Sequence, residues 1–207
     1  MRAPVDNHDP LEFQSRLLDA LFSHEAPFSV PSCHRDNTHA GAMIRCLDCD
    51  NTTLSCIACT LQQHQNQPLH RIRRWNGSYY EQDSLARLGL IISLGHIGNT
   101  CPSQNLLSGP QLVTVMDITG LHYVRIGWCR CFSGPSHSSQ LFALGWIPAT
   151  LSRPTTAFTF RVMKHFQMLS HVARMTPWDF CIAIQRLTDN IEPEELPVSQ
   201  ILWSICH

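Results

Sequence analysis

Cysteines and histidines recur in closely spaced pairs between residues 33 and 70. In chain order the pairs are Cys33 with Asp36, Cys46 with Cys49, Cys56 with Cys59, and His64 with His70. A C-x2-C turn lets two thiolates reach one ion, because the backbone between them curls around it at a Zn–S distance of about 2.3 Å. Four pairs supply ligands for two tetrahedral sites, and a zinc ion with four protein ligands keeps no open position for catalysis. The pattern therefore predicts structural Zn²⁺ rather than a catalytic metal.

The first pair leaves an alternative open. A carboxylate is an accepted zinc ligand, but His34 and His39 compete with Asp36 for its position. Cys33 and Asp36 are also compatible with an ordinary loop, in which case this segment binds one ion only.

A second group of ligands lies further along the chain. Cys129-Arg130-Cys131 falls on a predicted strand, where residues i and i+2 point to the same face, so both thiols could reach one ion. His96 and Cys101 would complete the tetrahedron. The spacing alone fits buried free cysteines equally well. Both groups together predict two to three zinc ions per chain.

The composition and net charge exclude several classes of protein. Hydrophobic residues make up 43% of 207 residues and charged residues only 15%, which excludes a chain that is mainly disordered. The net charge of -1 provides no global positive field, so nucleic-acid binding would need a local patch. Met1–Asp9 lacks the apolar core of a signal peptide, and Leu88–Leu94 is too short to span a membrane. A chain that is not secreted keeps its thiols reduced, which favours metal ligation over disulfides.

The sequence predicts an N-terminal helix, a hairpin and two C-terminal helices around these ligands. This combination of elements indicates the α+β class. Asp9-Pro10-Leu11-Glu12 is a helix start, and Asp117–Gly120 suits the turn of a hairpin that joins strands 111–116 and 121–131. Residues 140–146 suggest a third strand, and residues 83–95 fit either a short helix or a buried strand.

The C-terminal third has helical spacing of apolar residues. One stripe runs from Phe158 to Ala173, with Thr155 or Thr156 as its cap. A second helix starts at Thr176-Pro177, with Phe180, Ile184 and Leu187 on one face. We interpret both as core helices.

The four ligand pairs resemble those of the B-box and other cross-braced zinc modules. In such modules pairs one and three share one ion, and pairs two and four share the other. The resemblance thus implies two ligand sets, namely Cys33, Asp36, Cys56 and Cys59, and Cys46, Cys49, His64 and His70.

From about Cys46 to Asn190 the chain resembles the cysteine-cluster domain associated with KDZ (Kyakuja–Dileera–Zisupton) transposases of fungi. The matching motifs are Arg45-Cys46-Leu47-Asp48-Cys49, Cys56-x2-Cys59, Pro68-Leu69-His70-Arg71-Ile72, Trp75-Asn76-Gly77, Leu94-Gly95-His96, Cys101, Asp117-x2-Gly120-x-His122, Cys129-x-Cys131, Trp146-Ile147-Pro148-Ala149-Thr150, Pro154-x-Thr156-Ala157-Phe158-Thr159-Phe160 and Leu187-Thr188-Asp189-Asn190. The C-x-C pair is a hallmark of that family, which favours a second zinc-binding group over free thiols.

The resemblance also implies an organisation and a compartment. In full-length relatives the catalytic transposase domain lies downstream, so we expect a truncated copy that lacks it. We expect an N-terminal helix and linker over 1–30, a B-box-like zinc module over 31–75, the KDZ-associated domain with its helices over 76–190, and a divergent tail over 191–207. The location implied is nuclear, with the cytoplasm as the alternative.

The leading hypothesis is a non-catalytic zinc-binding module that helps a KDZ transposase find DNA or a protein partner, with no membrane and no small-molecule substrate. The candidate DNA contacts are Arg71, Arg73, Arg74 and Trp75. The alternative is a B-box-like protein-interaction module with no nucleic-acid role, which suits the near-zero net charge. A third hypothesis, an RNase H-like nuclease remnant using Asp117, is weak because the hairpin turn already explains that residue and no acidic trio follows. We therefore do not expect an enzyme.

Overall fold

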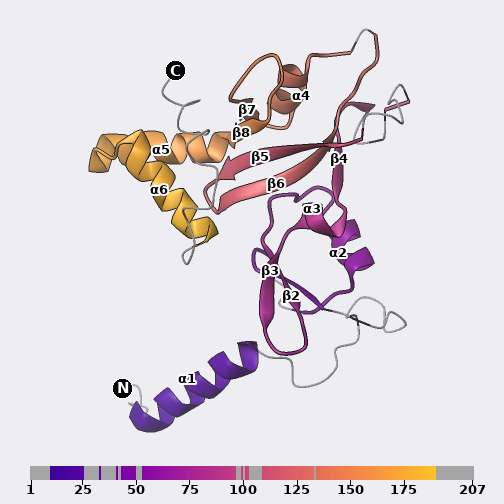
Figure 1. The fold of residues 1–207 in the computed structure, drawn as a ribbon. Coiled ribbons are helices and arrows are strands. Elements are labelled where there is room, and N and C mark those ends of the chain that lie inside the picture. The colour runs from indigo at the N-terminus through magenta and orange to yellow at the C-terminus, as the bar shows by residue number, and fades with distance from the viewer. Residues whose placement is uncertain are drawn as a thin grey trace, which may run out of the picture. The chain divides into compact units, whose positions relative to one another are not determined.

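The computed structural model describes residues 10–25, 33, 41, 43–49, 53–96, 99, 101–102, 109–132 and 134–189. Within these ranges the chain forms six helices and eight strands in two sheets, so the predicted α+β class is confirmed (Figure 1). Two compact units are present, residues 1–62 with 70–83 and residues 63–69 with 84–207. No described helix combines the length and the apolar composition that crossing a membrane requires.

The first unit is built on a three-stranded antiparallel sheet. Its strands lie in the order β1 (Ile44–Cys46), β2 (Ile72–Trp75) and β3 (Tyr80–Asp83). Cys46 is paired with Ile72, so the end of β1 lies beside the start of β2. The short helix α2 (Ile57–Gln63) follows Cys56. This arrangement brings three cysteine- or histidine-bearing segments to one end of the small sheet.

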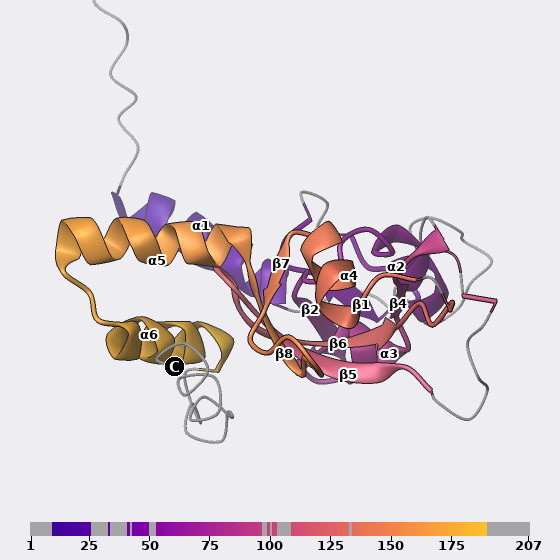
Figure 2. The ribbon, with the colours of Figure 1, turned by 90° about the horizontal axis from the view of Figure 1, so that it is seen from above.

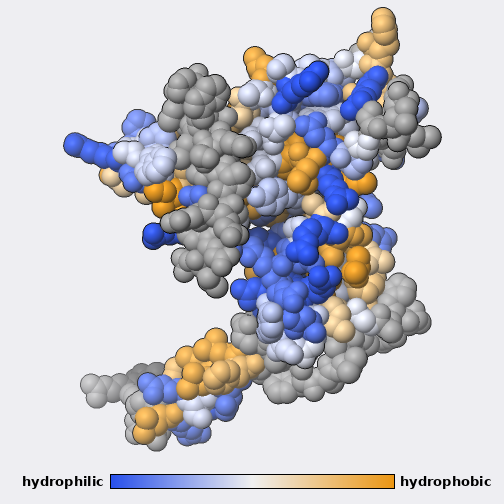
Figure 3. All heavy atoms as spheres, in the orientation of Figure 1, coloured by the Kyte–Doolittle hydropathy of each residue, from blue (hydrophilic) through white to orange (hydrophobic). Residues whose placement is uncertain are grey.

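The N-terminal helix, α1 (Pro10–Glu25), begins at its proline, as the sequence predicted. The predicted cap, Asp9, lies outside the described residues. All side chains from residue 11 to 22 are exposed, including large apolar ones. Figure 3 shows apolar side chains in orange along this helix.

The second unit contains a mixed five-stranded sheet in the order β4-β6-β5-β8-β7. Its centre is the predicted hairpin, confirmed as β5 (Gln111–Asp117) and β6 (Gly120–Gly127), with Asp117 and Gly120 paired across the turn. Residues 83–95, for which the sequence allowed a helix or a strand, form both, helix α3 (Leu85–Leu88) and strand β4 (Ile91–Ser93). β4 runs parallel to β6.

Two strand predictions are wrong. Residues 140–143 belong to helix α4 (His137–Ala143), which Ser136 caps, and the strand β7 (Trp146–Pro148) begins only after it. The C-x-C pair lies beyond the end of β6 at Gly127, in irregular backbone. The Gln140 side chain, from α4, takes both backbone hydrogen bonds of Cys129 that a neighbouring strand would otherwise supply.

The first C-terminal helix starts later than predicted. Thr156–Thr159 form β8, which pairs with β5 and β7, and Thr159 rather than Thr155 or Thr156 caps α5 (Phe160–Ala173). Sheet pairing therefore takes Phe158 out of the helix. The predicted start of the second helix is confirmed, because Thr176 caps α6 (Pro177–Thr188). Phe180 and Ile184 are buried as expected, whereas Leu187 is exposed.

Two apolar clusters hold the second unit together. Val113 and Val115 of β5 belong to one, and Met116 belongs to the other, as the alternation of side chains along a strand requires. The cluster containing Met116 includes the buried residues of α5 and α6. These two helices lie side by side at the hairpin-turn end of the sheet, where Phe166 and Phe180 have ring centroids 5.2 Å apart (Figure 2).

Candidate metal centres

Cys33, Cys56 and Cys59 form a three-cysteine cluster. Their sulfurs lie within 4.8 Å of one another, and all three residues are buried. The Cys56 N–H donates to the Cys33 sulfur and the Cys59 N–H donates to the Cys56 sulfur, each over 3.4 Å. Cys56 precedes α2 and Cys59 lies in its first turn, which explains how a C-x2-C pair converges. Asp36, His34 and His39, the candidates for a fourth ligand, lie outside the described residues.

The pKa of Cys59 is raised by the other thiols of this cluster. The hydrogen bond to Cys56, burial, and the nearness of Cys33 together raise the pKa of the Cys59 thiol to about 11. Thiols so close together keep their protons unless a cation compensates the thiolate charges. Metal binding here would therefore release protons and weaken as the pH falls.

The second group contains two cysteines and two histidines, the Cys2His2 cluster. Its members are Cys46, Cys49, His64 and His70, whose ligand atoms all lie within 4.8 Å of one another. The His70 Nδ1 atom lies 3.5 Å from the Cys46 sulfur and 3.3 Å from the Cys49 sulfur. His64 is only 2% exposed. Cys46 and His70, the two ends of a 25-residue stretch, thus come together because β1 pairs with β2.

Asp48, between the two cysteines of this cluster, fixes the segment that follows His70. Its carboxylate accepts a hydrogen bond from the Arg71 N–H over 2.6 Å and forms an ion pair with Nη2 of the same residue over 2.6 Å. Burial opposes ionisation, but the hydrogen bonds and charge of Arg71 outweigh it and keep the pKa of Asp48 below its ordinary value. Sequence reasoning missed this contact, because no spacing rule links Asp48 to a partner 23 residues further along the chain.

The third group, the 96–131 cluster, lies wholly in the second unit. His96 Nε2 is 3.4 Å from the Cys129 sulfur and 3.3 Å from the Cys131 sulfur. The Cys101 sulfur is 3.9 Å from that of Cys129 and 3.7 Å from that of Cys131. Cys101 and Cys129 are buried, Cys131 is half-buried, and His96 is exposed.

These distances fit a tetrahedral ion. Four ligands around zinc with Zn–S of about 2.3 Å and Zn–N of about 2.0 Å place sulfurs about 3.8 Å apart and a sulfur about 3.5 Å from a nitrogen. The observed sulfur–sulfur distances of 3.7 and 3.9 Å agree with the first value and are far too long for a disulfide, whose S–S bond is about 2.05 Å. Three thiols and one imidazole are a donor set that suits zinc.

The family model of the CxC2-like cysteine cluster associated with KDZ transposases matches residues 85–192. The chain belongs to this family. The match begins after the first two clusters and contains the whole 96–131 cluster, so it starts further along the chain than the resemblance that began at Cys46. No curated protein and no solved structure matches the chain.

Within the CxC2 region, Gln140 positions Cys129. Its Nε2 group donates to the carbonyl oxygens of Cys129 (3.0 Å) and Pro135 (2.9 Å), and its Oε1 accepts from the Cys129 N–H over 2.8 Å. Gln140 is buried, at 4% exposure. The sequence did not reveal this role, because Gln140 lies in a segment that was predicted to be a strand.

Gly95 leaves room for the Cys129 side chain in the 96–131 cluster. A Cβ at Gly95 would lie 2.8 Å from the Cys129 Cβ, and the backbone φ of +80° is strained for any other residue. We expect Gly95→Ala to lower the free energy of unfolding by about 2 kcal/mol and to weaken zinc binding at this cluster. Chelator competition measures the affinity. Gly109→Ala is the matched control, since Gly109 has open space and no positive φ, and an equal loss in both variants would refute a specific role for Gly95.

The basic stretch after His70 is largely engaged within its own sheet. Arg71 pairs with Asp48, and Arg74 pairs with Asp83 over 3.4 Å. The Trp75 ring packs edge-on against Tyr80, with centroids 5.0 Å apart. Arg73 lies between these residues on β2 and is half-buried. Arg71 and Arg74, two of the predicted phosphate contacts, thus form ion pairs within the chain.

Asp117, the residue of the nuclease hypothesis, is completely buried. Its carboxylate accepts hydrogen bonds from the Thr159 hydroxyl over 2.6 Å and from Arg161 Nη2 over 2.8 Å. A third bond comes from the Thr119 hydroxyl over 3.2 Å. Asp117 therefore ties the end of β5 to the start of α5.

Proposed function

We propose that the chain is a non-catalytic zinc-binding module that acts with a KDZ-type transposase and supports its recognition of a partner. The 96–131 cluster carries this proposal, because it lies inside the family region and places three sulfurs and one nitrogen at tetrahedral spacing. An ion held by His96, Cys101, Cys129 and Cys131 has no free coordination position, so its role is to hold the fold. Action beside a transposase implies a nuclear location.

The same proposal assigns the other ligands. One zinc ion would take Cys46, Cys49, His64 and His70, the four members of the Cys2His2 cluster. Another would take Cys33, Cys56 and Cys59, with Asp36 as the fourth ligand and His34 or His39 as its alternatives. Pairs one and three of the sequence then share an ion, as do pairs two and four, which is the cross-braced pattern.

Native mass spectrometry of the purified chain should count two to three zinc ions. Three are expected if a fourth ligand completes the three-cysteine cluster, and two if it does not. Cys129→Ser should lower the count by one, while Cys181→Ala, a buried cysteine outside the clusters, should leave it unchanged. A content below one ion per chain would contradict the zinc proposal.

We favour a protein partner over DNA. The chain has a net charge of -1, and the ion pairs of Arg71 and Arg74 reduce the positive charge that the basic stretch offers to phosphates. DNA recognition remains the second candidate because Arg73, flanked by these residues, has a half-exposed side chain.

A salt titration of DNA binding separates the two candidates. One phosphate contact contributes a slope of about -0.9 in log K against log salt, so Arg73→Ala should change the slope by no more than that. We expect weak, salt-insensitive binding in the wild type and no difference between Arg73→Ala and the control Arg125→Ala, an exposed arginine on β6. Steep salt dependence that Arg73→Ala alone reduces would place DNA recognition ahead.

A further inference from the structure

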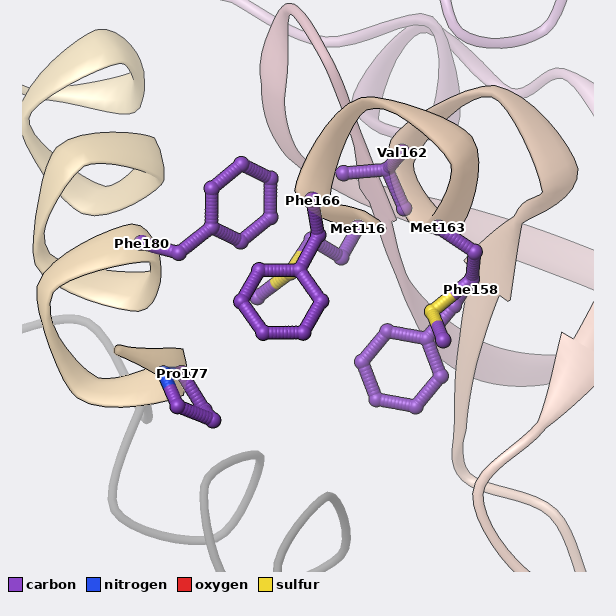
Figure 4. Close-up of a pocket in the computed structure, with 7 residues that line it drawn as sticks. All are labelled: Met116, Phe158, Val162, Met163, Phe166, Pro177 and Phe180. Atoms are coloured by element: carbon purple, nitrogen blue, oxygen red, sulfur yellow. The ribbon is translucent and has the colours of Figure 1, made fainter. Parts of the chain in front are cut away.

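Helix α5 has apolar side chains on two sides, and only the inner side is buried. Val162, Met163 and Phe166 lie on the inner side, where they line a small apolar crevice together with Pro177 and Phe180 of α6 (Figure 4). This crevice belongs to the core of the second unit, since Val162 and Phe180 are buried. The inner side of α5 is therefore already covered by its own chain.

The outer side of α5 carries a row of exposed side chains, which we call the outer ridge. Its members, Phe160, Lys164, Met168 and Val172, follow one another at intervals of four and so lie in one line along the helix. Phe160 is 53% exposed, Met168 56% and Val172 80%. Apolar side chains that are gathered on a surface, rather than scattered singly, indicate a binding site. Since the i+4 row of one helix packs into the groove of another, this ridge suits a partner helix.

The second unit also concentrates the positive charge of the chain. Residues 84–189 contain eight arginines and lysines but only three carboxylates, so this stretch carries +5 while the rest of the chain carries -6. The net charge of -1 thus conceals a basic unit beside acidic segments. A basic unit attracts partners that carry carboxylates or phosphates.

Two of these cations lie on the outer side of α5, a helix that contains no carboxylate. Lys164 belongs to the outer ridge, is exposed, and forms no ion pair within the described part of the chain. Arg161 precedes Lys164 by three residues and Met168 by seven, so it lies beside the ridge. Its pairing with the buried Asp117 over 2.8 Å leaves the Arg161 side chain 64% exposed. An occupant of the ridge therefore meets positive charge next to apolar side chains.

This combination favours a protein over a nucleic acid. Phosphate contacts from Arg161 and Lys164 would give a slope of only about -1.8 in log K against log salt. Phe160, Met168 and Val172 gain nothing from a phosphate backbone, which offers charge and no apolar surface. An amphipathic helix with carboxylates beside its apolar side chains matches both the cations and the apolar members of the ridge.

We propose that the outer ridge of α5 binds an acidic amphipathic helix of a partner protein. The apolar side chains of that helix pack against Phe160, Met168 and Val172. Its carboxylates pair with Lys164 and with the exposed part of Arg161. This docking rests on the proposed function for the class of its partner, a protein, whereas the ridge can be tested without any transposase.

Amide NMR of the full, zinc-loaded chain, titrated with a designed peptide, tests the site. The peptide is a helix of about 18 residues with leucines at intervals of three and four and glutamates on both sides of them. A second peptide carries lysines in place of the glutamates. At about 1 mM, a concentration that reveals Kd values as weak as about 1 mM, the glutamate peptide should shift the amide resonances of residues 160–172 and the lysine peptide should not. No shift with the glutamate peptide, or equal shifts with both peptides, would overturn the proposal.

Two variants with a new negative charge locate the contact. Lys164→Glu and Met168→Glu should each weaken binding of the glutamate peptide by about tenfold or more. The matched controls are Arg153→Glu, at an exposed arginine outside α5, and Leu187→Glu on α6, where Leu187 is 55% exposed compared with 56% for Met168. Both controls should change the Kd by less than about threefold.

Equal losses in the ridge variants and their controls would show that net charge alone attracts the peptide, and the ridge would lose its role. The zinc content of all four variants should equal that of the wild type, because none of the four residues is a proposed ligand. Zinc content tests the proposed function and peptide affinity tests the ridge, so a failure of one is distinguishable from a failure of the other.

A DNA duplex of about 16 base pairs serves as the competing ligand. At about 150 mM NaCl the duplex should shift the resonances of residues 160–172 less than the glutamate peptide does. Tighter binding of the duplex to the same residues, abolished by Lys164→Glu, would assign the ridge to nucleic acid and overturn the protein partner.

Discussion

Removing zinc with a chelator should unfold the β1–β2–β3 sheet and spare most of the five-stranded sheet. Structural zinc supplies about 10–16 kcal/mol in small fingers, compared with about 5–15 kcal/mol for the stability of a whole domain. A two-dimensional amide NMR spectrum recorded before and after chelation measures the effect. Resonances of residues 43–83 should collapse to unfolded positions, whereas those of β5 and β6 should stay dispersed.

The two units should respond differently to zinc removal because different side chains fill their interiors. In the described part of the first unit, the buried apolar cluster consists of the cysteines Cys33, Cys56 and Cys59, with Leu54 packed against them, and the other buried apolar side chains are Ile44 and Ile72. Without an ion these thiols bring little hydrophobic stabilisation. The second unit instead has two clusters of apolar side chains that do not involve the proposed ligands, so only the segments around the 96–131 cluster should loosen.

Cys49→Ser should reproduce the effect of chelation on the small sheet, because it removes one ligand of the Cys2His2 cluster. Cys181→Ala provides the matched control, since this buried cysteine packs within the apolar cluster of α5 and α6. Amide dispersion that is unchanged by both the chelator and Cys49→Ser would show that zinc does not hold this unit together.

Asp117→Ala should lower the free energy of unfolding by about 2–4 kcal/mol, because it removes a buried carboxylate that accepts three hydrogen bonds. The midpoint of thermal unfolding should fall by about 5–15 °C. The estimate stays below the cost of breaking a fully buried ion pair, since the Arg161 side chain is 64% exposed and can return to water.

Asp179→Ala tests whether the position of the carboxylate matters. Asp179 is an exposed residue that accepts a hydrogen bond from the capping Thr176, so its loss should cost only about 1 kcal/mol. Equal effects of the two substitutions would contradict a special role for Asp117. If Asp117→Asn instead abolished a metal-dependent DNA cleavage while the fold persisted, the nuclease hypothesis would return.

Local patterns in the sequence predicted the parts of the fold that depend on neighbouring residues. Thr176-Pro177 predicted the start of α6, because a cap needs only the N–H groups of the next turn. Asp117–Gly120 predicted the hairpin, because a two-residue connection leaves few alternatives. The pairing of thiols in C-x2-C turns also depends on a few residues, so candidate ligands were visible without a structure.

Tertiary structure decided what depends on residues far apart in the chain. Sheet pairing made Thr156–Thr159 a strand and moved the cap of α5 to Thr159, although the apolar stripe alone indicated an earlier helix. Arg71 and Arg74 looked like free cations until β1 and β3 brought Asp48 and Asp83 beside them. The C-x-C pair was expected on a strand, and the Gln140 side chain holds Cys129 in irregular backbone instead. In each case a contact between distant segments outweighed a local preference, because burying a side chain or satisfying a backbone group is worth more than the small intrinsic propensity of a few residues.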